Sequence, residues 1–428
     1  MECTDMKYQA YLDILKEELV PAMGCTEPIA IAYGAALARK TLGEIPDRVL
    51  IEASGNLIKN VKSVIVPNTC GLKGIPAAAA AGIVAGNSDK LLEVIAEVNE
   101  KDKKATKDYL ENHIIDVKLA DSKLTFDLYI TVFKGESYVK IRIVNYHTNI
   151  VLIEKDGKKL LEEGIKGDTE VKLTDRSLLN IKDIVEFANT VKIEDVKPVI
   201  ERQVEYNTKI AEEGLKNNYG ANIGKIMLST YGNDVKVRAK AMAAAGSDAR
   251  MNGCELPVVI VSGSGNQGMT ASLPVIEFAK ELKVDEEKMY RALVVSNLAT
   301  IHQKTGIGRL SAFCGAVSAG CGSGAGICYL YGGGYEEIAH TIVNALAIVS
   351  GMVCDGAKAS CAAKISSAVE AGILGYYMYK NGQEFKDGDG IISKGVENTI
   401  RNIGRLGKNG MKATDEEILQ IMVGNKCM

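Results

Sequence analysis

The sequence predicts an α+β fold, in which an N-terminal domain of antiparallel sheet and helices precedes a mainly α-helical domain. The first observation is a run of strands that alternate apolar and polar residues, at 114–119, 124–133, 137–145 and 150–154. The second is a change of pattern at about residue 183, after which apolar residues recur mainly at helical spacing. The third is the length of 428 residues, which allows two or three domains.

The N-terminal part mixes helices with strands. Turn-forming pairs, Lys134-Gly135 and Asp156-Gly157, separate the alternating strands, as expected of an antiparallel sheet. Upstream of that run we predict helices and two further strands. The helices are expected at 8–19, 28–42, 77–85, 90–99 and 104–112, and the strands at 48–53 and 61–66.

The C-terminal part is predicted to hold one short apolar strand, at 256–261, among helices. These helices are expected at 184–190, 195–216, 234–251, 270–282, 285–298, 336–352, 362–378 and 391–403. The charged segment 154–176 is the expected boundary zone. We therefore predict two domains, at 1–190 and 191–428.

Composition excludes several classes of partner and site. With 51 basic and 54 acidic residues the net charge is -3, so nucleic acid and anionic membranes are poor partners. The N-terminus does not resemble a signal peptide, and no apolar run approaches the roughly 20 residues of a spanning helix, so a cytoplasmic protein is expected. Ten cysteines in a reducing compartment point away from disulfides, and four histidines make a histidine-rich metal site hard to build.

The motif MGCTEP at 23–28 is the first that could carry chemistry. Thr26 suits a helix N-cap and Pro28 a first turn, which puts Cys25 at a helix N-terminus. The helix dipole stabilises a thiolate there, so we expect a lowered pKa and a base or nucleophile. The alternative is a structural cysteine in a corner between helices.

Three polar loops follow predicted strands, where ligands often bind. They are SGN at 54–56, PNTCGLKG at 67–74 and SGSGNQG at 262–268. The last leads into a helix whose first N–H groups would suit a phosphate or a carboxylate. Ordinary turns are the alternative in each case. A pyridoxal-phosphate lyase is a rival interpretation, with Lys73 or Lys358 as the Schiff-base lysine.

The late cysteines lack the C-x-x-C pairs of zinc fingers and ferredoxins. Cys314, Cys321 and Cys328 are seven residues apart, as are Cys354 and Cys361. The segment CDGAK at 354–358 is a polar break between apolar helices, so the spacing indicates a thiolate metal site without saying which three cysteines form it. The glycine-rich stretch 306–334 allows close approach to a ligand or tight helix packing. Cys3, Cys70 and Cys427 are expected to pack as small apolar residues.

The sequence resembles the L-cysteine desulfidase family, which is related to the iron–sulfur L-serine dehydratases. The motifs that carry this resemblance span nearly the whole chain and are MGCTEP at 23–28, VPNTCGLKG at 66–74, NYHTNIV at 145–151, SGSGNQG at 262–268, IGRLSAFCG at 307–315 and MVCDGAKASCA at 352–362. The resemblance implies one 4Fe–4S cluster per chain, held by Cys314, Cys354 and Cys361, with Cys25 as the catalytic base. It leaves Cys321 and Cys328 as packing residues.

The implied reaction is the conversion of L-cysteine to pyruvate, ammonia and sulfide. The chain departs from the serine dehydratases at Pro67-Asn68-Thr69, where they have Gly-His, and in the shorter spacing of Cys354 and Cys361, so cysteine is favoured as substrate. Its carboxylate is expected to bind among residues that are polar or charged, namely Asn56, Asn68, Asn266, Gln267 and Arg309. An iron–sulfur L-serine dehydratase and a non-enzymatic iron–sulfur scaffold are alternatives, and the small-residue helices permit a homodimer.

Overall fold

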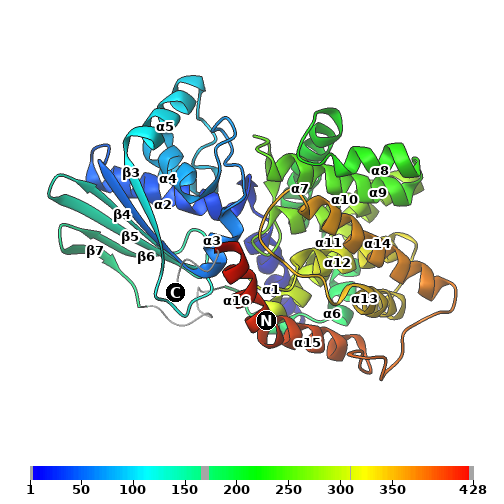
Figure 1. The fold of residues 1–428 in the computed structure, drawn as a ribbon. Helices are drawn as coiled ribbons and strands as arrows, with labels where there is room; N and C mark the ends of the chain where they lie inside the picture. The colour runs from blue at the N-terminus through cyan, green and yellow to red at the C-terminus, as the bar shows by residue number, and fades with distance from the viewer. Residues whose placement is uncertain (1–2, 165–172, 309, 424–428) are drawn as a thin grey trace.

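A computed structural model describes residues 3–164, 173–308 and 310–423, and it confirms the α+β fold (Figure 1). The sheet strands are β2 (Arg48–Ala53), β3 (Ile114–Leu119), β4 (Asp127–Lys134), β5 (Ser137–Val144), β6 (Ile150–Lys155) and β7 (Lys158–Glu162). The helices before and among them are α1 (Cys3–Glu18), α2 (Thr26–Leu42), α3 (Gly55–Val61), α4 (Gly74–Ala85) and α5 (Glu100–Asn112).

The C-terminal part is mainly helical, as predicted. Its longer helices are α6 (Ile181–Thr190), α7 (Ile193–Lys216), α8 (Ile223–Tyr231), α9 (Val235–Met251), α10 (Gly265–Leu282), α11 (Glu286–Ile307), α12 (Gly315–Leu330), α13 (Tyr335–Val349), α14 (Cys361–Lys380), α15 (Val396–Arg405) and α16 (Lys412–Val423). None of the helices in the described ranges is both long and apolar enough to cross a membrane.

The six-stranded sheet has the order β3-β2-β4-β5-β6-β7, and α2 covers one of its faces. Alternate residues of the paired strands β4 and β5 point to that face, with Ile130 opposite Ile141. Gly34 lets α2 lie close to the sheet, because a Cβ there would be 2.7 Å from Cδ1 of Ile130. Helix α4 packs on α2 in the same way, since a Cβ on Gly82 would lie 2.1 Å from the Ala32 carbonyl oxygen.

Four local predictions were wrong. Residues 90–99 form no α-helix, because only a 3-10 helix at Ser88–Glu93 covers part of them and the non-helical backbone of Leu91, with a φ of 50°, interrupts it. Residues 61–66 are not a strand, because Leu57 and Val61 recur at helical spacing on the buried face of α3, and only a single bridge joins Ile65 to Lys73. Strand β3 pairs parallel, not antiparallel, with β2. Cys70 is exposed rather than packed. The side chain of Cys3 and the whole of Cys427 lie outside the described residues.

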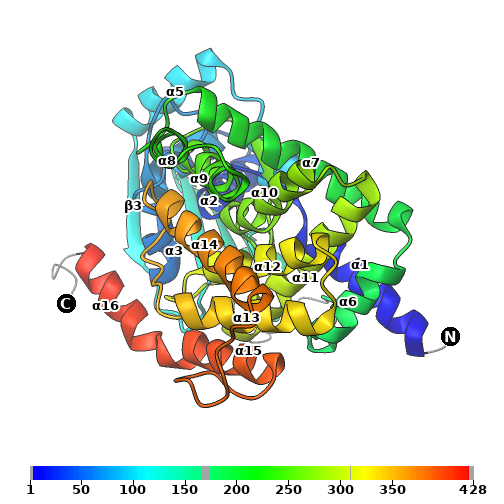
Figure 2. The same cartoon turned by 90° about the vertical axis from the view of Figure 1, so that its right-hand side faces the viewer.

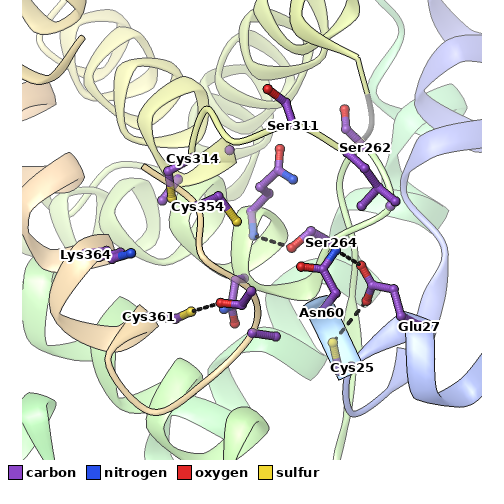
Figure 3. Close-up of a pocket in the computed structure, with 18 of the residues that line it drawn as sticks. Cys25, Glu27, Asn60, Ser262, Ser264, Ser311, Cys314, Cys354, Cys361 and Lys364 are labelled. Carbon is purple, nitrogen blue, oxygen red and sulfur yellow. Dashed lines mark hydrogen bonds between the residues drawn. The ribbon is translucent and has the colours of Figure 1, made fainter. Parts of the chain in front are cut away.

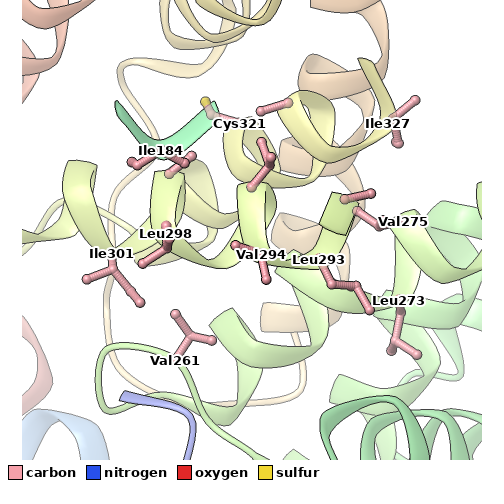
Figure 4. Packing of buried hydrophobic residues seen from close by; sticks show 14 of the residues in the cluster. Ile184, Val261, Leu273, Val275, Leu293, Val294, Leu298, Ile301, Cys321 and Ile327 are labelled. Atoms are coloured by element: carbon pink, nitrogen blue, oxygen red, sulfur yellow. The ribbon is translucent and has the colours of Figure 1, made fainter. Parts of the chain in front are cut away.

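The helical core is built around α10, α11 and α12, with α13 and α14 packed on α12 (Figure 2). Cys321 lies in this core among aliphatic side chains (Figure 4). Cys328 is equally buried. The glycine-rich stretch serves tight packing, because a Cβ on Gly320 would lie 2.3 Å from the Ala368 carbonyl oxygen of α14. Helix approach at such distances requires glycine.

A two-stranded ribbon joins the two parts of the chain. Strand β1 (Pro21–Met23) pairs antiparallel with β8 (Pro257–Val259), so the segment before Cys25 runs beside the segment before Ser262. Helix α1 also packs into the helical core. The domain boundary near residue 190 stays a prediction.

Asp248 on α9 is a buried carboxylate that caps the N-terminus of α8. Its Oδ2 accepts a hydrogen bond from Gly224 N at 3.1 Å, whereas Asn222 at the helix start makes no side-chain cap. Its Oδ1 has no hydrogen-bond partner within the described part of the chain. Burial raises the pKa of Asp248 to about 6, against the opposing backbone hydrogen bonds from Gly224 and Ile223.

We expect Asp248→Asn to stabilise the protein more at pH 7.5 than at pH 4.5. The folded pKa lies above the ordinary value of 3.8, so the stabilising contribution of the carboxyl is lost as pH rises through about 6. A shift of two pKa units corresponds to at most roughly 3 kcal/mol in the free energy of unfolding. Urea unfolding at both pH values measures the difference.

Asp234→Asn is the matched control, because Asp234 caps α9 from an exposed position. The backbone N–H of Val237 lowers the pKa of Asp234, so its titration falls below this pH range. An equal pH dependence in the two variants would contradict the account of Asp248.

Candidate active site

One pocket lies where the N-terminal part meets the helical part, and most of the predicted site residues line it (Figure 3). Its volume is about 110 Å³. One water needs about 10–15 Å³ by this measure, so a group of several atoms fits. The residues with chemical capability that line it are Cys25, Glu27, Asn60, His147, Arg250, Ser262, Ser264, Asn266, Gln267, Lys304, Ser311, Cys314, Cys354, Cys361 and Lys364.

Four helices begin at this pocket. Cys25 is the N-cap of α2, Ser264 of α10 and Cys314 of α12, and Cys361 is the first residue of α14. Each helix N-terminus carries partial positive charge and unsatisfied N–H groups. The pocket is therefore suited to an anionic ligand.

Backbone pairing places two of the three predicted cluster cysteines side by side. The N–H of Cys314 donates to Met352 O at 3.1 Å, and the N–H of Cys354 donates to Ala312 O at 2.6 Å. Cys361 approaches the same loop, with its thiol 3.6 Å from Gly356 O. Cys314 and the later pair Cys354 and Cys361 thus face one pocket, although 40 residues separate Cys314 from Cys354 (Figure 3).

Electrostatics favour the protonated state of Cys314 and Cys361 in the protein by itself. Burial raises the pKa of Cys314, and the neighbouring Cys354 raises it further. Burial also raises the pKa of Cys361, and Cys354 adds to that rise. A bound cationic centre reverses this preference, because metal coordination deprotonates thiols.

The donor set fits a cluster better than a single ion. Among the described residues, no group of three or more His, Cys, Asp or Glu is arranged to hold one metal ion. A cubic cluster binds each cysteine at a separate iron, so its ligands need not converge on one point. Three thiols with room for several atoms between helix N-termini meet that requirement, and soft thiolate donors select iron–sulfur centres.

Charged residues surround the loop that carries Cys354. Asp355 pairs with both Lys358 and Lys364, and Lys364 also donates to Val353 O at 2.8 Å. Partial burial would raise the pKa of Asp355, but hydrogen bonds from the two lysines outweigh it and lower the pKa to about 2. From the other side, the buried Lys59 pairs with Asp415 of α16 and donates to Cys354 O at 3.5 Å. These contacts fix the loop from two sides.

Cys25 belongs to a separate hydrogen-bond network, although Cys361 packs against the small buried cluster that contains it. Its thiol donates to Glu27 Oε2 at 3.0 Å, and Asn60 Nδ2 donates to Glu27 Oε1 at 3.3 Å. Thr26 Oγ1 donates to Gly263 O at 2.9 Å, which ties this network to the SGSGNQG loop. The expected lowering of the Cys25 pKa by the helix dipole was wrong: burial raises it well above the usual value, and the Glu27 charge adds to the rise.

The predicted substrate residues divide into two groups. Asn266 and Gln267 line the pocket with the four cysteines. Asn56 and Asn68 are not among its lining residues, and the Asn68 amide instead donates to Ile95 O at 2.7 Å. Arg309 lies outside the described residues.

Lys73 and Lys358, the candidate Schiff-base lysines, do not line the pocket either.

Sequence reasoning missed several charged or polar residues that line the pocket, namely Glu27, Asn60, His147, Arg250, Lys304 and Lys364. Glu27 and His147 lie inside the motifs MGCTEP and NYHTNIV, which offered a signal, whereas Arg250 lies in the last turn of an ordinary helical pattern.

At pH 8, we expect iodoacetamide to alkylate Cys70 much faster than Cys25. The reactive form is the thiolate, and Cys25 is both buried and held as a thiol, whereas Cys70 is exposed. Peptide mass spectrometry over time measures both rates. Glu27→Gln should speed the labelling of Cys25, because it removes the negative charge. Equal rates at the two cysteines in the wild-type protein would contradict this geometry.

Comparisons with known proteins identify the family. The profile described as "Serine dehydratase alpha chain" matches residues 89–420. A UPF0597 protein of Desulfitobacterium hafniense (strain Y51) is 67% identical over 427 residues, covering 100% of this chain and 99% of the relative. UPF0597 proteins of Lachnoclostridium phytofermentans and Treponema denticola are 55% and 50% identical, covering 97% and 99% of this chain and 100% of each relative. The chain therefore belongs to the serine dehydratase alpha chain family, a family of lyase-type enzymes that depend on iron–sulfur clusters.

Proposed function

We propose that this protein is a cytoplasmic L-cysteine desulfidase, which eliminates sulfide from L-cysteine to give pyruvate and ammonia. The observation that carries the proposal is the single pocket lined by Cys314, Cys354 and Cys361 together with Cys25. The first three would hold a 4Fe–4S cluster. When bound, the cluster would supply a Lewis acid for the substrate sulfur.

Cys25 is the proposed base that removes the Cα proton of the substrate. Its raised pKa means that its thiolate, once formed, is a strong proton acceptor. Glu27 Oε2 lies 3.0 Å from the Cys25 sulfur and is placed to accept the thiol proton. Cys25 is 2% exposed, so bulk water is kept from this step. Loss of the Cα proton and of the sulfur leaves aminoacrylate, which tautomerises to an imine and hydrolyses to pyruvate and ammonia.

Cysteine is favoured over serine by the Pro67-Asn68-Thr69 segment. This segment stands where the serine dehydratases carry Gly-His, and the Asn68 amide is engaged by the Ile95 carbonyl instead of the pocket. An L-serine dehydratase is the second candidate, and the family match favours it.

Protein prepared without oxygen should contain about four iron and four sulfide ions per chain, as this cluster type requires. It should release sulfide and pyruvate from L-cysteine and lose both the cluster and the activity in air. Iron and acid-labile sulfide analysis, with pyruvate and sulfide assays on cysteine and serine, measures these properties. Turnover of serine alone would favour the second candidate. Protein without iron but with a borohydride-reducible chromophore would favour a pyridoxal enzyme. Protein that holds a cluster but forms no pyruvate would favour a non-enzymatic scaffold.

Cys25→Ala should retain its iron and lose roughly 100-fold or more in kcat, because a positioned base contributes about that much. Cys314→Ala should instead lose its iron. Cys70→Ala is the control, since Cys70 is exposed and outside the pocket, and it should keep both iron and activity. Full cysteine breakdown by Cys25→Ala would show that another group is the base.

A further inference from the structure

We propose that Arg250 and Gln267 bind the two charged groups of an α-amino acid, with Arg250 taking the carboxylate and Gln267 the ammonium. The inference deepens the proposed function, on which its assignment to the substrate rests. It replaces the asparagines at 56 and 68 as carboxylate ligands with a residue that the sequence did not single out.

Arg250 is a buried cation without a counter-ion in the described part of the chain. It is 2% exposed, and the one hydrogen bond of its guanidinium group is from Nη1 to Asn266 Oδ1, at 3.1 Å. Its Nε has no partner among the described residues. Burying a guanidinium against a single neutral amide is unfavourable, and a bound carboxylate would supply the missing charge.

The position of Arg250 matches that role. A Cβ on Gly265, the first residue of α10, would lie 2.4 Å from Arg250 Nε, so the guanidinium lies against the helix N-terminus. The helix dipole and the planar guanidinium then favour the same ligand, an anion with two oxygens. Two independent features of one wall of the pocket thus indicate a carboxylate.

Gln267 supplies the complementary group. It is 5% exposed, and its Oε1 has no hydrogen-bond donor among the residues described. Its amide is held against Gly315 at the start of α12, where a Cβ would lie 2.6 Å from Gln267 Cδ. A buried acceptor without a donor is suited to an ammonium group, and the Glu27 carboxylate in the same pocket favours that charge.

An unsatisfied cation and an unsatisfied acceptor in one pocket match a zwitterion. A ligand lacking either charge leaves one of the two groups unpaired, and such losses discriminate strongly between ligands. The pocket should therefore prefer α-amino acids to simple thiols, amines or carboxylic acids of the same size.

Ligand-observed NMR titration of the anaerobically prepared protein tests this with L-alanine, ethylamine and propionate as probes. L-alanine carries both charges and no leaving group, ethylamine lacks the carboxylate and propionate lacks the ammonium. Wild-type protein should bind L-alanine roughly 30-fold or more tightly than either partial analogue. Equal binding of L-alanine and ethylamine would overturn the proposal without any variant.

Arg250→Met should weaken L-alanine binding roughly 30-fold and leave ethylamine binding unchanged. Arg250→Lys should restore part of the lost affinity for L-alanine, because lysine keeps the charge but lacks the planar guanidinium group that binds two oxygens at once. This variant remains informative if the methionine variant does not fold. Arg39→Met is the matched control, since Arg39 is half-buried, has an unpartnered Nε among the described residues and lies outside the pocket.

The two proposals fail separately. Unchanged L-alanine binding in Arg250→Met, with sulfide still released from cysteine at the wild-type KM, would overturn this inference and leave the desulfidase standing. Arg250-dependent binding of L-alanine by a protein that releases no sulfide would instead overturn the desulfidase proposal and leave this inference standing.

Discussion

The site depends on four helix N-termini meeting at one junction. Two short backbone pairings enforce this meeting: β1 with β8 aligns the starts of α2 and α10, and the bridge between Phe313 and Val353 aligns Cys314 with Cys354. Neither pairing belongs to the six-stranded sheet. Each instead fixes where helix dipoles and N–H groups point, and those determine which charges the pocket accepts.

Glycines make that convergence sterically possible. A Cβ on Gly268 of α10 would lie 2.0 Å from the Val259 carbonyl oxygen of β8, and one on Gly372 of α14 would lie 2.2 Å from the Gly320 carbonyl oxygen of α12. These contacts bring the backbones of neighbouring elements nearer than side chains allow, so the N-terminal ends of these helices can share one small cavity. The glycine-rich composition of this half of the chain is thus a packing feature with a consequence for the site.

The sequence was informative where a pattern is local. Period-two alternation located β4 and β5, and the thiols of Cys314, Cys354 and Cys361 were selected by motif and then found in one pocket. It failed where a role depends on a distant contact. Arg250 lies in the last turn of α9, and only the fold brings it against Gly265. The helix-dipole argument also predicted the wrong direction for the Cys25 pKa. Burial and the Glu27 charge raise this pKa and outweigh the dipole, which would lower it.

The contributions of the two parts of the chain to the pocket are unequal, and this has an evolutionary consequence. Residues 250–364 provide the three thiols, the guanidinium and the amide, and all of them lie within the segment matched by the family profile. Cys25, Glu27 and Asn60 come from the first 88 residues, outside that segment. Because the two sets of groups lie in different parts of the sequence, substitutions that change proton transfer can arise without altering the segment that carries the three thiols.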